Sequence, residues 1–108
     1  MSDIFILIRR QDNVALTSIG GIPFVTQLRQ GSQLLAEETV DLIYADAGFD
    51  DLPPGHYTIA VRQERVEPKE AVYDIEIEAE DEVILLRFTY LESARVLLEI
   101  QASREKRL

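Results

Sequence analysis

The chain has 108 residues, of which 46% are hydrophobic, and it contains no cysteine. This length fits one domain with its own core and is too short for two, and the lack of cysteine excludes disulfides, zinc–thiolate sites and thiol nucleophiles. The formal net charge is −9, and a surface of that sign repels phosphate backbones and anionic lipid headgroups, so we expect no nucleic acid and no membrane as partner.

The negative charge is concentrated in the middle of the chain. Residues 36–82 contain fifteen acids and three bases, whereas residues 83–108 contain five bases and three acids. We expect residues 1–103 to form one domain and residues 104–108 to form a flexible basic tail, since charged chain ends are usually solvated. Asp3 precedes the first apolar run and no small-residue cleavage site follows, which is not typical of a secretory signal. The expected location is cytoplasmic.

Short runs of β-branched and aromatic residues, separated by Gly, Pro, Asn and Asp, predict strands along most of the chain. In the first run, residues 4–8, three Ile side chains share one face while Phe5 and Leu7 occupy the other. A strand that is apolar on both faces is usually covered on both sides. A short strand over residues 14–19, a turn at Gly20 and Gly21, and a strand over residues 22–25 are expected next.

Residues 32–44 carry conflicting signals. Ser32 is a suitable helix N-cap and the LLAEE sequence after it favours helix, whereas Val40, Leu42 and Tyr44 alternate as in a strand. We predict a strand for the second half of this segment and leave a short helix over residues 32–38 open. Residues 46–55 are dense in Asp, Gly and Pro, which predicts a loop.

The second half of the chain shows cleaner alternation. Apolar residues at every second position predict the inner faces of three strands, namely Tyr57, Ile59 and Val61; Tyr73, Ile75 and Ile77; and Val96, Leu98 and Ile100. Residues 83–91 begin apolar on both faces and predict a central strand. The expected fold class is therefore all-β, a single antiparallel β-sandwich of about seven strands.

The phrase DAGFDDLPPGHYTIAV, residues 46–61, resembles a motif of transthyretin-like and carboxypeptidase-regulatory-like β-sandwiches and of the related Cna-B repeats. In these families a turn with Asp and Gly leads through an aromatic residue to Leu-Pro-x-Gly-x-Tyr, and here Leu52, Pro53, Gly55 and Tyr57 stand in the matching places. The resemblance implies a prealbumin-like sandwich that serves as an accessory or interaction module. The chain lacks the several histidines and the terminal Tyr-Arg-Gly-Ser phrase of the ureide-hydrolysing branch.

His56, the only histidine, is the first candidate for chemistry, because histidine is the commonest general base near neutral pH. Together with Asp50, Asp51 or Tyr57 it could serve a small hydrolase or lyase. It has no serine or cysteine at motif spacing, so we expect a solvent-facing residue at a corner and a protein that is not an enzyme.

Asp46, Asp50 and Asp51 are weak candidates for a cation site, because Ca²⁺ prefers carboxylate and carbonyl oxygens. Their spacing matches no EF-hand, and Asp also stabilises turns by accepting hydrogen bonds from backbone two residues on. We expect turn chemistry, with no metal and no cofactor. A Ca²⁺-responsive binding module through residues 46–51 is the alternative.

The leading hypothesis is a non-catalytic protein-interaction or assembly module whose partner is another protein or a second copy of the chain. It is motivated by residues 4–8 and 83–86, which are apolar on both faces. A sandwich strand needs only one apolar face, so the second one suggests either a contact with a second copy of the chain or a covering helix.

Overall fold

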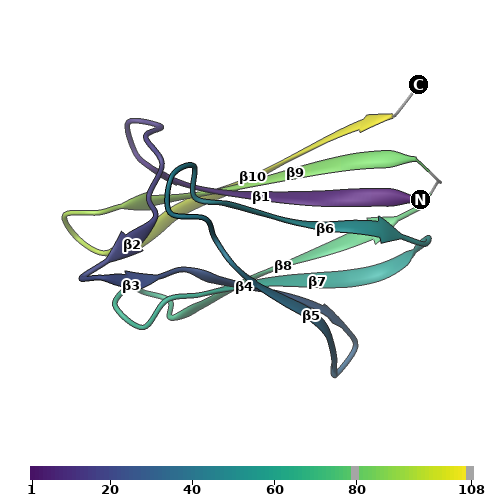
Figure 1. Ribbon diagram of the computed structural model, residues 1–108, viewed down its shortest axis with the longest axis horizontal. Helices are drawn as coiled ribbons and strands as arrows, with labels where there is room; N and C mark the ends of the chain where they lie inside the picture. The colour runs from purple at the N-terminus through teal and green to yellow at the C-terminus, as the bar shows by residue number, and fades with distance from the viewer. Residues whose placement is uncertain (79–80, 107–108) are drawn as a thin grey trace.

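The computed structural model describes residues 1–78 and 81–106, which form two four-stranded sheets packed face to face (Figure 1). The first sheet contains β1 (Ser2–Arg10), β6 (Asp46–Leu52), β9 (Glu82–Leu91) and β10 (Val96–Lys106). The second sheet contains β4 (Val25–Gln30), β5 (Gln33–Thr39), β7 (Gly55–Arg62) and β8 (Glu70–Ile77). No helix occurs in these described ranges, and the predicted all-β sandwich is confirmed.

The strand order is β10-β9-β1-β6 in the first sheet and β5-β4-β7-β8 in the second. The predicted antiparallel pairing holds for every pair of strands except the central one of the first sheet. There β1 and β9 run parallel, with Ile4 beside Ile84 and Ile8 beside Phe88. The first strand and the second-to-last strand therefore lie side by side at the centre of one sheet.

A hydrophobic core fills the space between the two sheets. Alternate residues of the central strands are almost completely buried, as predicted for residues 57–61: Ile4, Ile6 and Ile8 on β1, Ile84, Leu86, Phe88 and Tyr90 on β9, and Tyr57, Ile59 and Val61 on β7. The coverage expected on both faces of residues 4–8 is found on one face only, because Phe5 on the other face is exposed and Leu7 is half-buried. The predicted inner face of β8 is also confirmed, because Ile75 and Ile77 are buried. Burial of this apolar area is the main force that holds the sandwich together.

The segment between β1 and β4 is less regular than predicted. Ala15 forms only an isolated bridge with Arg9, and the expected strands shrink to β2 (Ser18–Ile19) and β3 (Ile22–Pro23). These two strands pair around Gly20 and Gly21, whose φ angles are 59° and 80°. Two consecutive positive φ values are what a tight two-residue hairpin turn requires, and glycine adopts them most readily.

The strand predicted for the second half of residues 32–44 is wrong, and the helix left open for residues 32–38 does not form. The segment with the helix option is strand β5, and the expected strand at its end is a turn that follows the buried Val40. Differences in helix propensity amount to only a few tenths of a kcal/mol per residue, so pairing with β4 overrides them. The strand β4 itself was not predicted, because its VTQLRQ sequence mixes polar residues with its inner Leu28.

Residues 46–52 are also a strand rather than the predicted loop. β6 pairs with β1 along the edge of the first sheet, and it turns Ala47 and Phe49 into the core. The register shifts between Ser2 and Ile4, and at this bulge Asp51 has a φ of 59°. An edge strand tolerates such Asp and Gly residues because only one of its sides must fit a neighbouring strand.

The LPPGHY phrase forms the corner between the two sheets. Leu52 is buried at the end of β6, and Pro53 and Pro54 carry the chain across to β7 in the second sheet. The hydroxyl of the buried Tyr57 donates a hydrogen bond to the carbonyl oxygen of Pro53 (2.7 Å). The expected position of Tyr57 at the start of an inner face is confirmed.

The last strand departs from the sequence expectation at two points. A register shift between Leu97 and Glu99 leaves Leu98 exposed, while Leu97 and Ile100 pack against the core. The predicted boundary at residue 103 is wrong, because β10 pairs with β9 as far as Lys106. Arg104 donates to the carbonyl oxygen of Glu76 (2.5 Å), which fixes part of the expected tail. Residues 107 and 108 lie outside the described residues.

The corner hydrogen bond generates a stability prediction. Tyr57→Phe removes the donor to the Pro53 carbonyl and should lower the free energy of unfolding by about 1 kcal/mol, measured by urea denaturation. Tyr90→Phe is the matched control, because the buried hydroxyl of Tyr90 has no hydrogen-bond partner among the described residues. Removal of the Tyr90 hydroxyl should leave the free energy of unfolding unchanged or raise it. Equal losses in the two variants would contradict the role of the corner bond.

Candidate interaction surface

His56 lies on the outer face of β7, opposite Glu76 of β8, and its side chain is exposed. No hydrogen bond or ion pair joins it to Asp50 or Asp51 in the described part of the chain. The hydroxyl of Tyr57 points the other way and is engaged at the corner. The structure therefore does not assemble the residues of the hydrolase hypothesis, and His56 occupies the solvent-facing position expected for it.

The three aspartates of the cation hypothesis are not gathered in one place. Asp46 opens β6 and Asp50 and Asp51 close it, so Asp46 lies about 13 Å or more from the other two along the strand. The backbone N–H of Asp51 donates to the carboxylate of Asp3 (3.0 Å), which stabilises the bulge. No group of three or more potential metal-ligating side chains occurs within residues 1–78 and 81–106.

Asp46 instead works together with Asp41, a residue that sequence reasoning did not single out. One carboxylate oxygen of Asp41 accepts hydrogen bonds from the backbone N–H groups of Ile43 (2.8 Å) and Tyr44 (2.6 Å). A hydrogen bond with Asp46, aided by these two donors, lowers the pKa of Asp41 to about 2. The same contact raises the pKa of Asp46. The pair closes the turn between β5 and β6.

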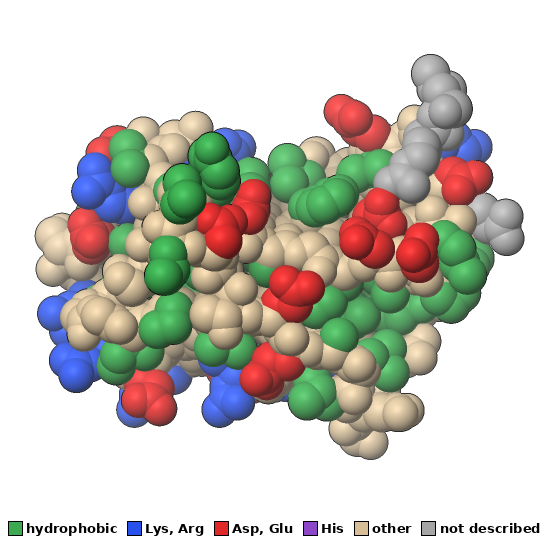
Figure 2. Space-filling model, in the orientation of Figure 1, with side chains coloured by type: hydrophobic (Ala, Val, Ile, Leu, Met, Phe, Trp, Pro, Cys, Tyr) green, Lys and Arg blue, Asp and Glu red, His purple; other side chains and the backbone are tan. Residues whose placement is uncertain are grey.

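This turn carries three large apolar side chains that are mostly exposed to solvent. The exposed fractions are 73% for Leu42, 74% for Ile43 and 65% for Tyr44. The turn is nevertheless fixed, because the guanidinium of Arg9 donates to the carbonyl oxygen of Tyr44 (2.7 Å) and Ala45 is completely buried. Figure 2 shows apolar side chains standing out from the surface where this turn lies.

β5, which precedes the turn, is exposed on both faces. Only Ala36 is partly covered, and Leu34 and Leu35 are exposed to 50% and 40%. The β4–β5 hairpin projects from the body of the sandwich (Figure 1). We call residues 33–44 the apolar segment, because five of the eleven large apolar side chains found to be exposed lie within it.

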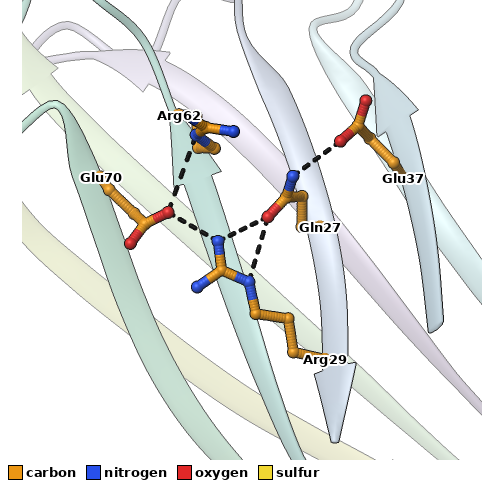
Figure 3. Close-up of polar contacts among 5 residues, drawn as sticks. All are labelled: Gln27, Arg29, Glu37, Arg62 and Glu70. Carbon is orange, nitrogen blue, oxygen red and sulfur yellow. Dashed lines mark hydrogen bonds and ion pairs between the residues drawn. The ribbon is translucent and has the colours of Figure 1, made fainter. Parts of the chain in front are cut away.

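A chain of polar contacts ties β5 to the outer face of the second sheet (Figure 3). The buried amide of Gln27 donates to Glu37 (2.6 Å) and accepts from Arg29 (3.0 Å). The guanidinium of Arg29 also donates a hydrogen bond to the carboxylate oxygen Oε1 of Glu70 (2.6 Å). The same oxygen forms an ion pair with Nε of Arg62 (3.7 Å). The hydrogen bond from Arg29 lowers the pKa of Glu70. These contacts cross all four strands of the sheet, so β5 is held by side chains as well as by its backbone.

A groove of about 860 Å³ lies beside this network. It is lined by Arg62, Arg65 and Lys69, which are the three basic residues of the acidic middle part of the chain, residues 36–82. Three acids, Glu37, Glu64 and Glu70, line the same groove. The opposite charges are equal in number, so the groove has no preference for an anion or a cation. It gives no basis for assigning a ligand.

Comparisons of the chain with protein-family models, with curated proteins and with solved structures gave no match. The transthyretin-like resemblance of residues 46–61 therefore stays a prediction that is carried by the motif alone. Within the described ranges, no helix has the length and apolar character needed to cross a bilayer.

The Asp41–Asp46 pair predicts a pH effect on stability. Because the pKa of Asp46 is raised in the folded state, its contribution is present below about pH 4, the ordinary Asp range, and is lost as the pH rises through the folded pKa. Asp46→Asn keeps a hydrogen-bond donor and removes the charge, so it should raise the melting temperature at neutral pH.

The measurement is the melting temperature of both proteins between neutral and mildly acidic pH. The advantage of Asp46→Asn should shrink as the wild-type carboxyl is protonated. Asp50→Asn serves as the control, because the exposed Asp50 takes part in no such pair. A difference that is independent of pH would contradict the shared hydrogen bond.

Proposed function

We propose that this chain is a non-catalytic, cytosolic protein-interaction module that binds a protein partner through the apolar segment, residues 33–44. The exposure of Leu42, Ile43 and Tyr44 on a turn that is fixed by hydrogen bonds carries the proposal. Contiguous exposed apolar surface marks interaction sites, since its burial against a partner is favourable. Large side chains on a loop that a rigid scaffold positions are the usual means of recognition.

The fixed turn also reduces the entropic cost of binding. The carboxylate of Asp41 accepts hydrogen bonds from two backbone N–H groups inside the turn. The side chain of Arg9, on β1, donates a hydrogen bond to a carbonyl oxygen of the turn. A segment that is already ordered loses less conformational freedom when a partner covers it. The resemblance of residues 46–61 to transthyretin-like and related accessory domains supports the same type of function.

Self-association is the second part of the proposal, and it is supported by the outer face of the first sheet. Phe5 and Leu85 are exposed on the neighbouring central strands, and Leu7 and Val83 beside them are half-buried. This face corresponds to the surplus apolar positions of residues 4–8 and 83–86. A second copy that covers it would remove these side chains from water.

Capture of proteins from an extract of the native host tests the apolar segment. We expect the Leu42→Ser/Ile43→Ser variant to lose specific partners that the wild-type chain retains, because these two are the most exposed apolar side chains of the segment. The matched control is Val72→Ser/Leu98→Ser, which alters exposed apolar residues (52% and 51%) outside the segment. Capture of the same proteins by all three chains would contradict the assignment.

Sedimentation velocity at micromolar concentration tests self-association. The wild-type chain should sediment as a dimer or larger assembly, and Phe5→Glu/Leu85→Glu should sediment as a monomer, because two carboxylates would then face the second copy without partners. Val72→Glu places a charge on the outer face of the other sheet and should leave the assembly intact. A wild-type chain that is monomeric throughout would remove this part of the proposal.

A further inference from the structure

β5 offers a free edge to a binding partner. Among the described residues it pairs only with β4, and its sequence, QLLAEET, contains no Lys, Arg or Pro. Lys and Pro are common protections of an exposed edge against pairing with another strand, and β5 has only the acidic Glu37 and Glu38 and the register shift between Leu34 and Ala36 in their place. We propose that this edge accepts an extended segment of a partner protein as an added strand, and that the segment carries two adjacent basic residues next to a short apolar run. The inference rests on the proposed function and specifies its binding mode.

The edge is accessible along its length. The β4–β5 hairpin projects from the sandwich, and six of the seven residues of β5 are exposed (Figure 1). An added strand would continue the second sheet outward, and its apolar side chains would lie beside Leu34 and Leu35. Main-chain hydrogen bonds give affinity in this mode of recognition, and side chains give specificity.

β5 is already an ordered, extended strand in the absence of a partner. The hydroxyl of Thr26 donates to the carbonyl oxygen of Glu38 (2.9 Å), and the amide of Gln27 donates to the carboxylate of Glu37 (2.6 Å). Residues 33–39 have a composition that favours helix, so pairing with β4 is what keeps them extended. A second paired strand would stabilise the same conformation.

The charge of β5 selects the partner. Glu37 and Glu38 are adjacent on the strand, so their side chains point to opposite faces. Neither carboxylate forms an ion pair with a side chain of the described ranges. Within the same ranges, the side-chain hydrogen bond of Glu37 comes from the neutral amide of Gln27. A partner strand with two adjacent basic residues places one charge opposite each carboxylate, and opposite charges across a ladder are favourable.

A second copy of the chain fits this edge poorly. Pairing two β5 strands would bring four carboxylates, from Glu37 and Glu38 of each copy, to one short ladder that contains no base. Like charges across a ladder are destabilising. A protein with an extended basic and apolar segment is therefore the occupant that the edge favours.

Fluorescence anisotropy with labelled, end-blocked peptides tests the proposal. The probe Thr-Arg-Arg-Val-Ile-Val-Thr places its arginines opposite Glu38 and Glu37 in antiparallel alignment, and the reversed sequence does so in parallel alignment. We expect one of the two to bind. Glu37→Lys/Glu38→Lys should weaken this binding by about tenfold or more and should favour the probe with Glu in place of Arg. Asp74→Lys/Glu76→Lys, the same charge change on the edge strand β8, is the matched control.

N-methylated peptides separate strand addition from simple charge attraction, and they leave the protein unchanged. In a paired strand, alternate N–H groups face the neighbouring strand. Of two peptides that are methylated at odd or at even positions, one should lose binding and the other should retain it. Equal affinity of both peptides would overturn the proposal. If the wild-type chain self-associates and the Glu37→Lys/Glu38→Lys variant does not, the β5 edge pairs with a second copy of the chain. That result would also overturn the proposal.

The outcome is distinguishable from failure of the proposed function. If partner capture depends on Leu42 and Ile43 but no peptide binds, the interaction module stands and strand addition to β5 is wrong. If peptide binding follows the methylation pattern and the charge of Glu37 and Glu38, strand addition is supported independently of any captured protein.

Discussion

The parallel pairing of β1 with β9 is the constraint on which the rest of the structure depends. It joins the first residues to a strand some eighty positions away, over the eight register pairs from Asp3–Val83 to Arg10–Tyr90. Ile4, Ile6 and Ile8 of β1 and Ile84, Leu86, Phe88 and Tyr90 of β9 are all almost completely buried, so the pair forms a continuous part of the core. With these two strands at the centre, β6 and β10 become the edges of the first sheet, and the corner after Leu52 delivers β7 to the middle of the second.

This arrangement separates stability from recognition. The central strands bury the apolar residues of their inner faces, whereas the three most exposed large apolar residues, Leu42, Ile43 and Tyr44, lie at the periphery in the turn that follows β5. That periphery is held by polar contacts, namely Gln27 with Glu37, Asp41 with the turn, and Arg9 with the Tyr44 carbonyl, and by the buried Val40 and Ala45 on either side of the turn. Exposed apolar side chains on an ordered backbone are a suitable surface for a partner, because little order is lost or gained on binding.

Part of the fold and little of the candidate surface could be predicted from the sequence. Alternation identified the inner faces of β7 and β8, because burial on one face leaves a period of two in the sequence. It did not show which face of β1 or β9 is buried, since both strands carry apolar residues on both faces. It failed at Leu98, where a register shift moves the neighbours to the other face, and at Leu42 and Tyr44, whose spacing suited a strand that does not form. The role of Asp41 was missed, although an Asp before a chain reversal is a recognised turn signal.

Local signals in the sequence were sufficient for the fold class, the buried faces of β7 and β8 and the turn at Gly20 and Gly21, since each depends on local backbone preferences or on which side chains avoid water. Long-range pairing set four other features: residues 33–39 are a strand, residues 46–52 pair along an edge, β1 lies parallel to β9, and Leu42, Ile43 and Tyr44 face solvent. These outcomes depend on partners distant in the chain, whose pairing free energy exceeds the small local propensities that a sequence pattern reports.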